Sequence, residues 1–135
     1  MHELITLHKY YIWANRFRDL MDKAFARLGP PTAENYKEYF VNDAGLFMSF
    51  WYSALYVVIE GYGHLSVSDP SIDELLKSPN TYLLKRYRNG VCHYQKDYFD
   101  QRFMDFMGQP DTPQWIRTVN SEFGRFFLER LTAAG

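Results

Sequence analysis

The stretch LFMSFWYSALYVVI, at residues 46–59, is the most apolar part of the chain. It is about 14 residues long, whereas a membrane-spanning helix needs roughly 20, so it predicts a helix buried in a folded core. Apolar residues at helical spacing extend this helix to residues 34–62, with Thr32 placed to cap its start. Its apolar face comprises Phe40, Phe47, Trp51, Ala54, Leu55, Val58 and Tyr62.

Helical spacing of apolar residues recurs through the rest of the chain. It predicts long helices over residues 3–27, 79–107 and 112–132, and a short helix over residues 72–77. No segment alternates with period two for long, so no strand is predicted. The sequence therefore predicts one all-α domain over residues 1–135, an up-and-down bundle of four long helices and one short helix.

The composition excludes several classes of protein. Fifteen basic and sixteen acidic residues give a net charge of −1, so bulk charge does not attract nucleic acid and only a local basic patch can. Cys92 is the single cysteine, which excludes an internal disulfide and a zinc site made mainly of cysteines, and it suits a reducing cytoplasm. The four histidines match no compact ligand motif, so we expect no metal. The first residues are charged and helical, so we expect no signal peptide and no membrane partner.

Aromatic residues make up 19% of the chain, which is more than the core of a small bundle needs. The excess predicts an interface lined by rings. Since symmetric dimers are the commonest homo-oligomers, we expect a homodimer, with the helix over residues 79–107 at or near the shared surface.

The stretch KRYRNGVCHY, at residues 85–94, holds the groups best suited to chemistry. On one continuous helix a single polar stripe would contain Arg86, Asn89, His93, Lys96 and Asp100. Arg88 would border the apolar face, about 140° around the axis from His93. Arginine can hold a phosphate through two hydrogen bonds, and histidine can exchange a proton near neutral pH. The cluster suits cleavage of a phosphodiester by a ribose hydroxyl.

Structural interpretations of the same stretch stay open. Basic residues on a helix usually form a solvated face, and a single histidine is usually structural or exposed. Asn89-Gly90 is also a strong turn signal and would divide the helix in two. Because the apolar series continues across this pair, we predict one helix with a tolerated glycine.

Two other features have both a structural and a functional interpretation. Tyr87, Tyr94 and Tyr98 can stack on bases, although their helical spacing favours a core or an interface. Glu60 ends an apolar run, where it either meets water or orients a basic residue.

Residues 88–93, RNGVCH, resemble the signature of the HEPN superfamily (higher eukaryote and prokaryote nucleotide-binding domains). That signature is an arginine followed by four to six residues and a histidine, often with a polar residue directly after the arginine, here Asn89. Leucines and basic residues precede the motif and an aromatic residue follows it. The run LYVVIEGY, at residues 55–62, resembles the long second helix of this group.

The resemblance implies a bundle that dimerises with its two motifs facing one cleft. It also implies a cytoplasmic, metal-independent endoribonuclease without a cofactor, of the kind found in toxin–antitoxin and phage-defence systems, with RNA as substrate and an antitoxin protein as a further partner. By the same resemblance Arg88 binds the scissile phosphate, His93 is the general acid or base, and Asn89 orients one of them. The expected RNA-binding residues are Lys85, Arg86 and Lys96.

The alternative function is a non-catalytic helical module for dimerisation or interaction, of the kind a mobile element can carry. The surroundings of His93 distinguish the two functions. A catalytic histidine must reach solvent near an arginine, whereas a structural one is buried and bonded to a local carbonyl.

Overall fold

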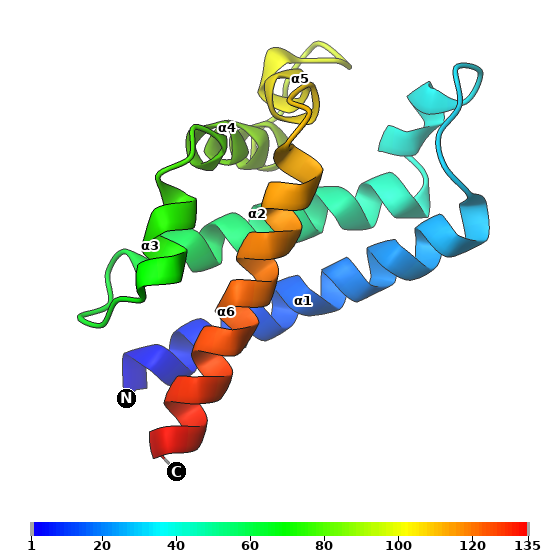
Figure 1. The fold of residues 1–135 in the computed structure, drawn as a ribbon. Coiled ribbons are helices and arrows are strands. Elements are labelled where there is room, and N and C mark those ends of the chain that lie inside the picture. The colour runs from blue at the N-terminus through cyan, green and yellow to red at the C-terminus, as the bar shows by residue number, and fades with distance from the viewer. Residues whose placement is uncertain (1, 135) are drawn as a thin grey trace.

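The computed structural model of the protein describes residues 2–134, and within this range every regular element is helical (Figure 1). The elements are α1 (His2–Leu28), the 3₁₀ helix η1 (Tyr36–Phe40), α2 (Asp43–Tyr62), α3 (Pro70–Leu76), α4 (Asn80–Cys92), α5 (Gln101–Met107) and α6 (Thr112–Ala134). The predicted all-α class is therefore confirmed.

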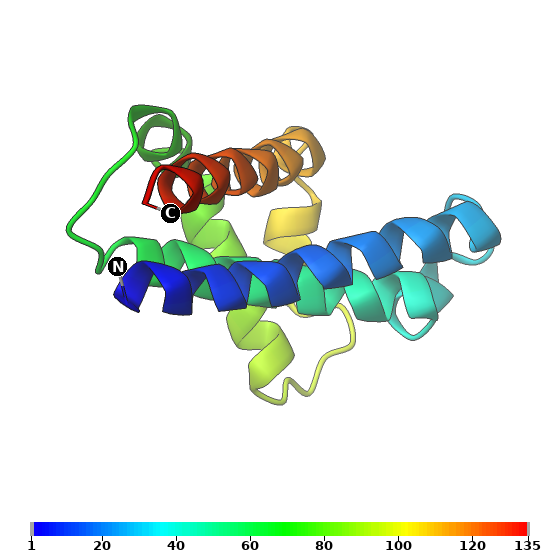
Figure 2. The same ribbon diagram turned by 90° about the horizontal axis from the view of Figure 1, so that it is seen from below.

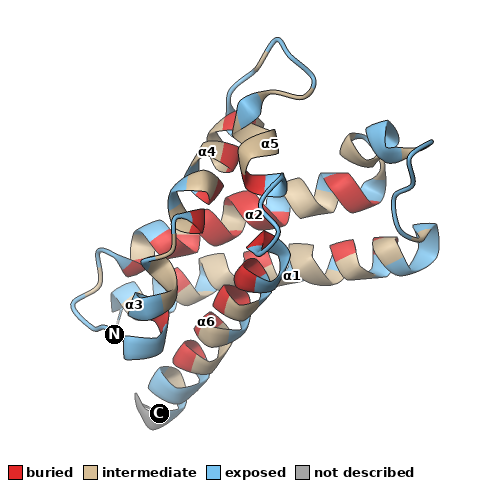
Figure 3. Ribbon diagram, turned by 45° about the horizontal axis from the view of Figure 1, so that its top comes forward, coloured by how far each residue is buried: buried red, intermediate tan, exposed pale blue. Residues whose placement is uncertain are grey.

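The two longest N-terminal helices form an antiparallel hairpin. α1 and α2 lie side by side along most of their length, and α6 crosses one face of the pair (Figures 1 and 2). Leu7, Ala14 and Met21 recur every seven residues on α1 and are buried, which gives this helix the apolar stripe that its spacing predicted. Buried residues are concentrated in the second half of α2, from Trp51 onward, and along one side of α6 (Figure 3).

Buried polar atoms of this core are hydrogen-bonded. The indole Nε1 of Trp51 donates to Oδ1 of Asn120 at 3.0 Å, and the hydroxyl of Tyr11 donates to the Asn120 carbonyl oxygen at 3.0 Å. Asn120 on α6 thus joins α1 to α2. Pairing these groups avoids the cost of burying an unsatisfied donor or acceptor.

The second helix starts later than predicted. Residues 34–42 form a turn and η1, and α2 begins at Asp43 with Asn42 as its cap, whose side chain accepts from the Gly45 amide. Thr32 instead exchanges hydrogen bonds with Asn35. A Cβ at position 45 would lie 1.3 Å from the Tyr39 carbonyl oxygen, so only glycine lets η1 pack against α2.

The predicted helix over residues 79–107 is wrong as a single element. α4 ends at Cys92, and the chain returns through residues 93–100 to α5, which packs on α4. Gly90 allows this return, because a Cβ there would lie 2.8 Å from a ring carbon of Phe103. Asp100 caps α5 by accepting from the Arg102 amide.

The bundle therefore differs from the predicted one of four long helices and a single short one. Within residues 2–134 three α-helices have 20 or more residues, α4 has 13, and α3 and α5 have 7 each. The short helix near residue 70 is where it was expected, capped by Asp69 with Pro70 in its first turn. α1 and α2 run up and down, but α4 crosses α2 steeply (Figures 1 and 2).

α2 is long and apolar enough to cross a membrane by length and composition alone. Half of this apolar stretch of α2 is buried inside the fold, and Trp51, Leu55 and Val58 are almost inaccessible to solvent. This burial is the pattern of the core helix that residues 46–59 predicted.

Candidate functional site

The guanidinium of Arg88 lies between α4 and α2. Its Nη1 is 3.7 Å from Oε1 of Glu60, and its Cζ is 5.1 Å from the ring centroid of Tyr56. Its Nε donates to Oδ1 of Asn89 at 3.1 Å. Arg88 is only about one-fifth exposed, so the aromatic ring, the carboxylate and the amide together define its orientation.

His93 is the residue at which α4 ends. Its backbone is extended, and its amide donates to the Asn89 carbonyl oxygen at 3.0 Å. The imidazole is exposed, and within residues 2–134 it takes part in no hydrogen bond or ion pair. The ring therefore keeps both nitrogens for solvent or a ligand.

Asn89 joins the two residues of the motif. Its side chain accepts from Arg88, while its backbone carbonyl accepts from the amide of His93. One residue thus contacts both the guanidinium and the end of the helix from which the imidazole projects. The bond to His93 is the last backbone bond of α4, so the Asn89 side chain orients only the guanidinium.

The polar stripe predicted on one helix is not formed, because α4 ends at His93. Lys96 lies in the following loop, and Asp100 caps α5 and pairs with Arg102. The Arg102 amide, which donates to Asp100, lowers the pKa of that carboxyl. Arg86 and Asn89 remain on α4.

The three predicted RNA-binding cations differ in their surroundings. Arg86 forms a hydrogen-bonded ion pair with Asp105 of α5, so its charge is balanced within the fold. Lys85 and Lys96 are exposed and have no ion-pair partner among the described residues. Of the three predicted cations, Lys85 and Lys96 therefore remain available to an external anion.

Glu60 is the site residue that the sequence left unassigned. It lies on α2, 28 residues before Arg88, so no local spacing could link the two. Burial, followed by the nearby Glu60 carboxylate, raises the pKa of Tyr56, while Arg88 lowers it. The Tyr56 hydroxyl therefore stays neutral between the two charges.

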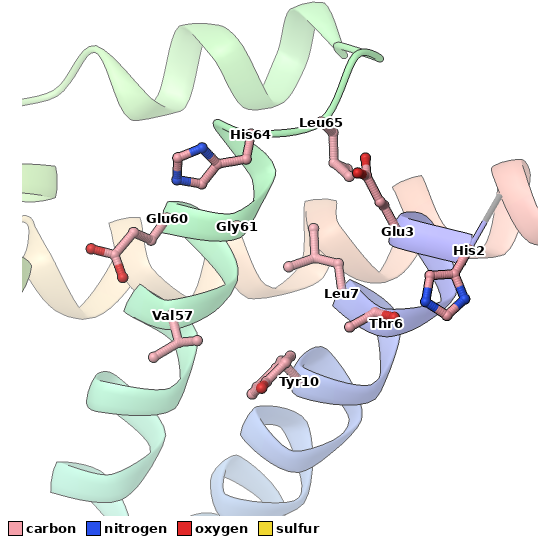
Figure 4. A pocket seen from close by; sticks show the side chains of 10 residues that line it. All are labelled: His2, Glu3, Thr6, Leu7, Tyr10, Val57, Glu60, Gly61, His64 and Leu65. Atoms are coloured by element: carbon pink, nitrogen blue, oxygen red, sulfur yellow. The ribbon is translucent and has the colours of Figure 1, made fainter.

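Glu60 also lines a groove between the last turns of α2 and the first turns of α1 (Figure 4). The groove has a volume of about 600 Å³ and opens on the face away from α6. Its other polar side chains are His2, Glu3, Thr6, Tyr10 and His64. No three His, Cys, Asp or Glu residues of the described range cluster closely enough to hold a metal ion.

No family model matches the chain, and no curated protein or solved structure is significantly similar to it. Its function is therefore inferred from the site itself. An arginine with a nearby amide, an exposed imidazole and two unpaired lysines can bind a phosphate and exchange a proton.

Proposed function

We propose that this chain is a metal-independent endoribonuclease of the HEPN type. Arg88 holds the scissile phosphate and His93 exchanges protons with the ribose. The observation that carries the proposal is the exposed imidazole of His93 at the end of the helix that also carries Arg88, whose guanidinium is hydrogen-bonded to the Asn89 side chain. A catalytic histidine must reach solvent in this way, and the proposal adds that Arg88 and His93 both reach the same bound phosphate.

In the proposed reaction the 2′-hydroxyl oxygen of a ribose attacks the adjacent phosphorus. The His93 imidazole takes the hydroxyl proton, the bond from phosphorus to the 5′ oxygen breaks, and the leaving oxygen takes up a proton from water. The products are a 2′,3′-cyclic phosphate and a free 5′-hydroxyl. Arg88 stabilises the charge that develops on the phosphoryl oxygens, a contribution that is typically about 3–4 kcal/mol for one well-placed donor.

A phosphate can bind Arg88 only if it displaces the Glu60 carboxylate from the guanidinium. Glu60 is about half exposed, and its distance of 3.7 Å from Arg88 is that of a loose ion pair. Such pairs contribute roughly 0–1 kcal/mol, so a dianionic or polyanionic ligand can replace the carboxylate at modest cost. Lys85 and Lys96 add charge for the neighbouring phosphates.

The biological setting belongs to the same proposal. We expect a cytoplasmic toxin or phage-defence element, held inactive by an antitoxin protein until its RNA targets are to be cut. Both expectations rest on the resemblance of residues 88–93 to the HEPN signature.

The deciding experiment incubates the purified chain with mixed RNA in excess chelator. His93→Ala should lower the rate by about 100- to 10,000-fold, because proton transfer is lost. His64→Ala is the matched control, since His64 is also exposed but lies at the end of α2. The fragments should end in a 2′,3′-cyclic phosphate. Equal cleavage by the parent and His93→Ala would contradict the proposal.

A second candidate function is a non-catalytic interaction module. The observation that favours it is the packing of Arg88 on Tyr56 beside Glu60, which ties α4 to α2. For this function Arg88→Ala would lower the melting temperature, and the parent would leave RNA intact in the same assay.

A further inference from the structure

A cavity lies at the end of the hairpin where α1 stops and α2 starts, and its volume is about 410 Å³. α1, η1, α2 and α5 all contribute to its walls. Figure 1 shows η1 beside the start of α2, at the end of the hairpin away from the N-terminus. Small-molecule sites in proteins have volumes of about 300–1,000 Å³, so this space, which we call the η1 cavity, is large enough for a ligand.

The walls of the η1 cavity are apolar. They include the rings of Phe25, Tyr39 and Phe40 and the thioethers of Met48, Met104 and Met107. No charged side chain of residues 2–134 lines the cavity, and the Tyr39 hydroxyl already donates to the Gly29 carbonyl oxygen at 2.6 Å. An ordered water needs about two to four polar partners, so the cavity suits an apolar occupant better than water.

The contacts of η1 hold these walls in place. The ring of Tyr39 stacks on that of Phe25 with centroids 6.0 Å apart, and its carbonyl oxygen lies where a Cβ of Gly45 would be. The ring of Phe40 lies 5.6 Å from that of Phe99, which precedes α5. Closing the cavity would break these contacts, so the space is formed before any ligand arrives. A preformed site loses little binding free energy to ordering of the protein.

Charged groups of the same elements lie outside the cavity. Arg27 and Asp43 form an exposed ion pair at 3.0 Å, so their charges are balanced. Nζ of the exposed Lys37 lies 5.9 Å from the ring centroid of Tyr36. An ionised ligand would therefore lose its hydration without gaining a partner inside the cavity. The η1 cavity thus selects against charge.

We propose that the η1 cavity binds one uncharged aromatic molecule of about two or three rings. The ring walls offer faces and edges to a flat ligand, and thioether sulfurs make favourable contacts with aromatic rings. Methionine side chains also adapt to the outline of a ligand, because they are unbranched and have several rotatable bonds. Neither Arg88 nor His93 lines the cavity, so the proposal does not depend on ribonuclease activity.

Two fluorescent probes of the same skeleton test the selectivity against charge on the unmodified chain. N-phenyl-1-naphthylamine is uncharged, and 8-anilino-1-naphthalenesulfonate is the same molecule with a sulfonate added. The uncharged probe should bind once per chain, with a saturable rise in emission and a Kd of roughly 10 μM. The sulfonate should bind at least about tenfold more weakly, because its charge must be desolvated.

Melting temperature and competition test two further properties of the site. At about ten times its Kd the uncharged probe should raise the melting temperature by about 3–6 °C, because it binds the folded chain and not the unfolded one. 1-Naphthol should displace the probe. Decahydro-1-naphthol, the saturated molecule of the same skeleton, should be about three- to tenfold less effective, because it lacks the aromatic contacts.

Variants test the position of the site. Met104→Trp should weaken binding of the uncharged probe at least about tenfold, because the larger side chain occupies part of the cavity. Leu128→Trp is the matched control and should bind like the parent, since it adds the same ring on α6, where Leu128 is 69% exposed and does not line the cavity. Circular dichroism checks that both variants keep their helix content.

Any of five results would overturn the proposal. Three are seen with the probes alone: no saturable binding of the uncharged probe, equal affinity for the sulfonate, and equal displacement by the two naphthols. The fourth is release of the probe as the chain associates with itself, since a second copy would then cover the cavity. The fifth is a folded Met104→Trp variant that binds like the parent. The first four use the unmodified chain, so they test the proposal even where Met104→Trp does not fold.

Discussion

Glu60 lies 3.7 Å from Arg88, so the cation of the candidate site already faces a carboxylate of the same chain. The contact joins α2 to α4 about one turn before α4 ends at Cys92, and His93, the next residue, is exposed. The Glu60 carboxylate therefore competes with any approaching phosphate for the Arg88 guanidinium.

Glu60→Gln should strengthen RNA binding. The substitution keeps the shape of the side chain and removes the competing charge, and since such a pair contributes at most about 1 kcal/mol, the gain in affinity should not exceed roughly fivefold. Fluorescence anisotropy with a labelled oligoribonucleotide, in a His93→Ala background that prevents cleavage, measures it. Glu74→Gln is the control, because Glu74 pairs with Lys77 on the distant α3. Weaker binding by Glu60→Gln would mean that Glu60 holds Arg88 in place for the ligand.

The basic residues of α4 and its following loop should divide into two groups. Lys85→Ala and Lys96→Ala should each weaken RNA binding and reduce the slope of log affinity against log salt by about 0.7, the value for one phosphate contact to a single strand. Arg86→Ala should leave the slope unchanged and destabilise the fold by about 1 kcal/mol, because Arg86 is paired with Asp105. Salt titrations and urea unfolding measure the two effects. A reduced slope for Arg86→Ala would show that its ion pair opens on binding.

Gly45→Ala should destabilise the protein by about 3 kcal/mol, near the upper end for overpacking. The added methyl group would overlap the Tyr39 carbonyl oxygen, which belongs to η1 and cannot move aside as a side chain does. Gly63→Ala is the matched control, since Gly63 has a helical backbone and a Cβ there would meet only ordinary contacts. Thermal unfolding measures both variants. Equal melting temperatures for the two would indicate that η1 does not pack on α2 in solution.

Asp69 should make stability depend on pH in the acid range. The hydrogen bond from Arg125 lowers the pKa of the Asp69 carboxyl, burial opposes this, and the Ile72 amide lowers it further. The pKa of Asp69 is lower in the folded state than in the unfolded state, where it is about 3.9. The stabilisation that the ionised Asp69 gives the fold is therefore complete above about pH 3.9. It is lost as the pH falls through the pKa of the folded state.

Asp69→Asn tests this dependence, because asparagine still caps α3 but cannot pair with Arg125 as an anion. It should cost about 1.5–3 kcal/mol at pH 7, and the difference from the parent should shrink below pH 4. Urea unfolding at several pH values measures it. Asp97→Asn is the control, since Asp97 is exposed and has no ion pair among the described residues. A difference that stays constant down to pH 2 would contradict the assignment.

Local sequence patterns were sufficient for the helices that end at strong signals. α1 and α6 match their predicted ranges to within two residues, because their apolar spacing is regular and Gly29 and Pro113 mark an end and a start. α3, predicted over residues 72–77, begins at Pro70 after the Asp69 cap, and both residues are helix-start signals that stand in the sequence. These signals act between near neighbours in the chain, so they persist whatever the rest of the fold does.

The end of α4 at Cys92 could not be predicted from the spacing of apolar residues. Tyr94 and Tyr98 continue the apolar series of α4, yet Tyr94 is exposed and Tyr98 donates through its hydroxyl to the Lys37 carbonyl oxygen of η1. Contacts between residues 61 positions apart thus compete with helix continuation, and the packing of Gly90 on Phe103 adds to them. The spacing of apolar residues along the chain carries no information about contacts between such distant residues.

The sequence by itself determined the all-α class, the burial of residues 46–59 and the motif residues Arg88, Asn89 and His93, because periodicity and residue chemistry are local properties. Only the tertiary structure decided what these residues meet. The fold sets Glu60 and Tyr56 against Arg88, ends α4 so that His93 reaches solvent, and takes Arg86 into an ion pair with Asp105. It also leaves one face of the α1–α2 hairpin uncovered, since α6 is directed to the other face by Asn120, which bonds to both Trp51 and Tyr11.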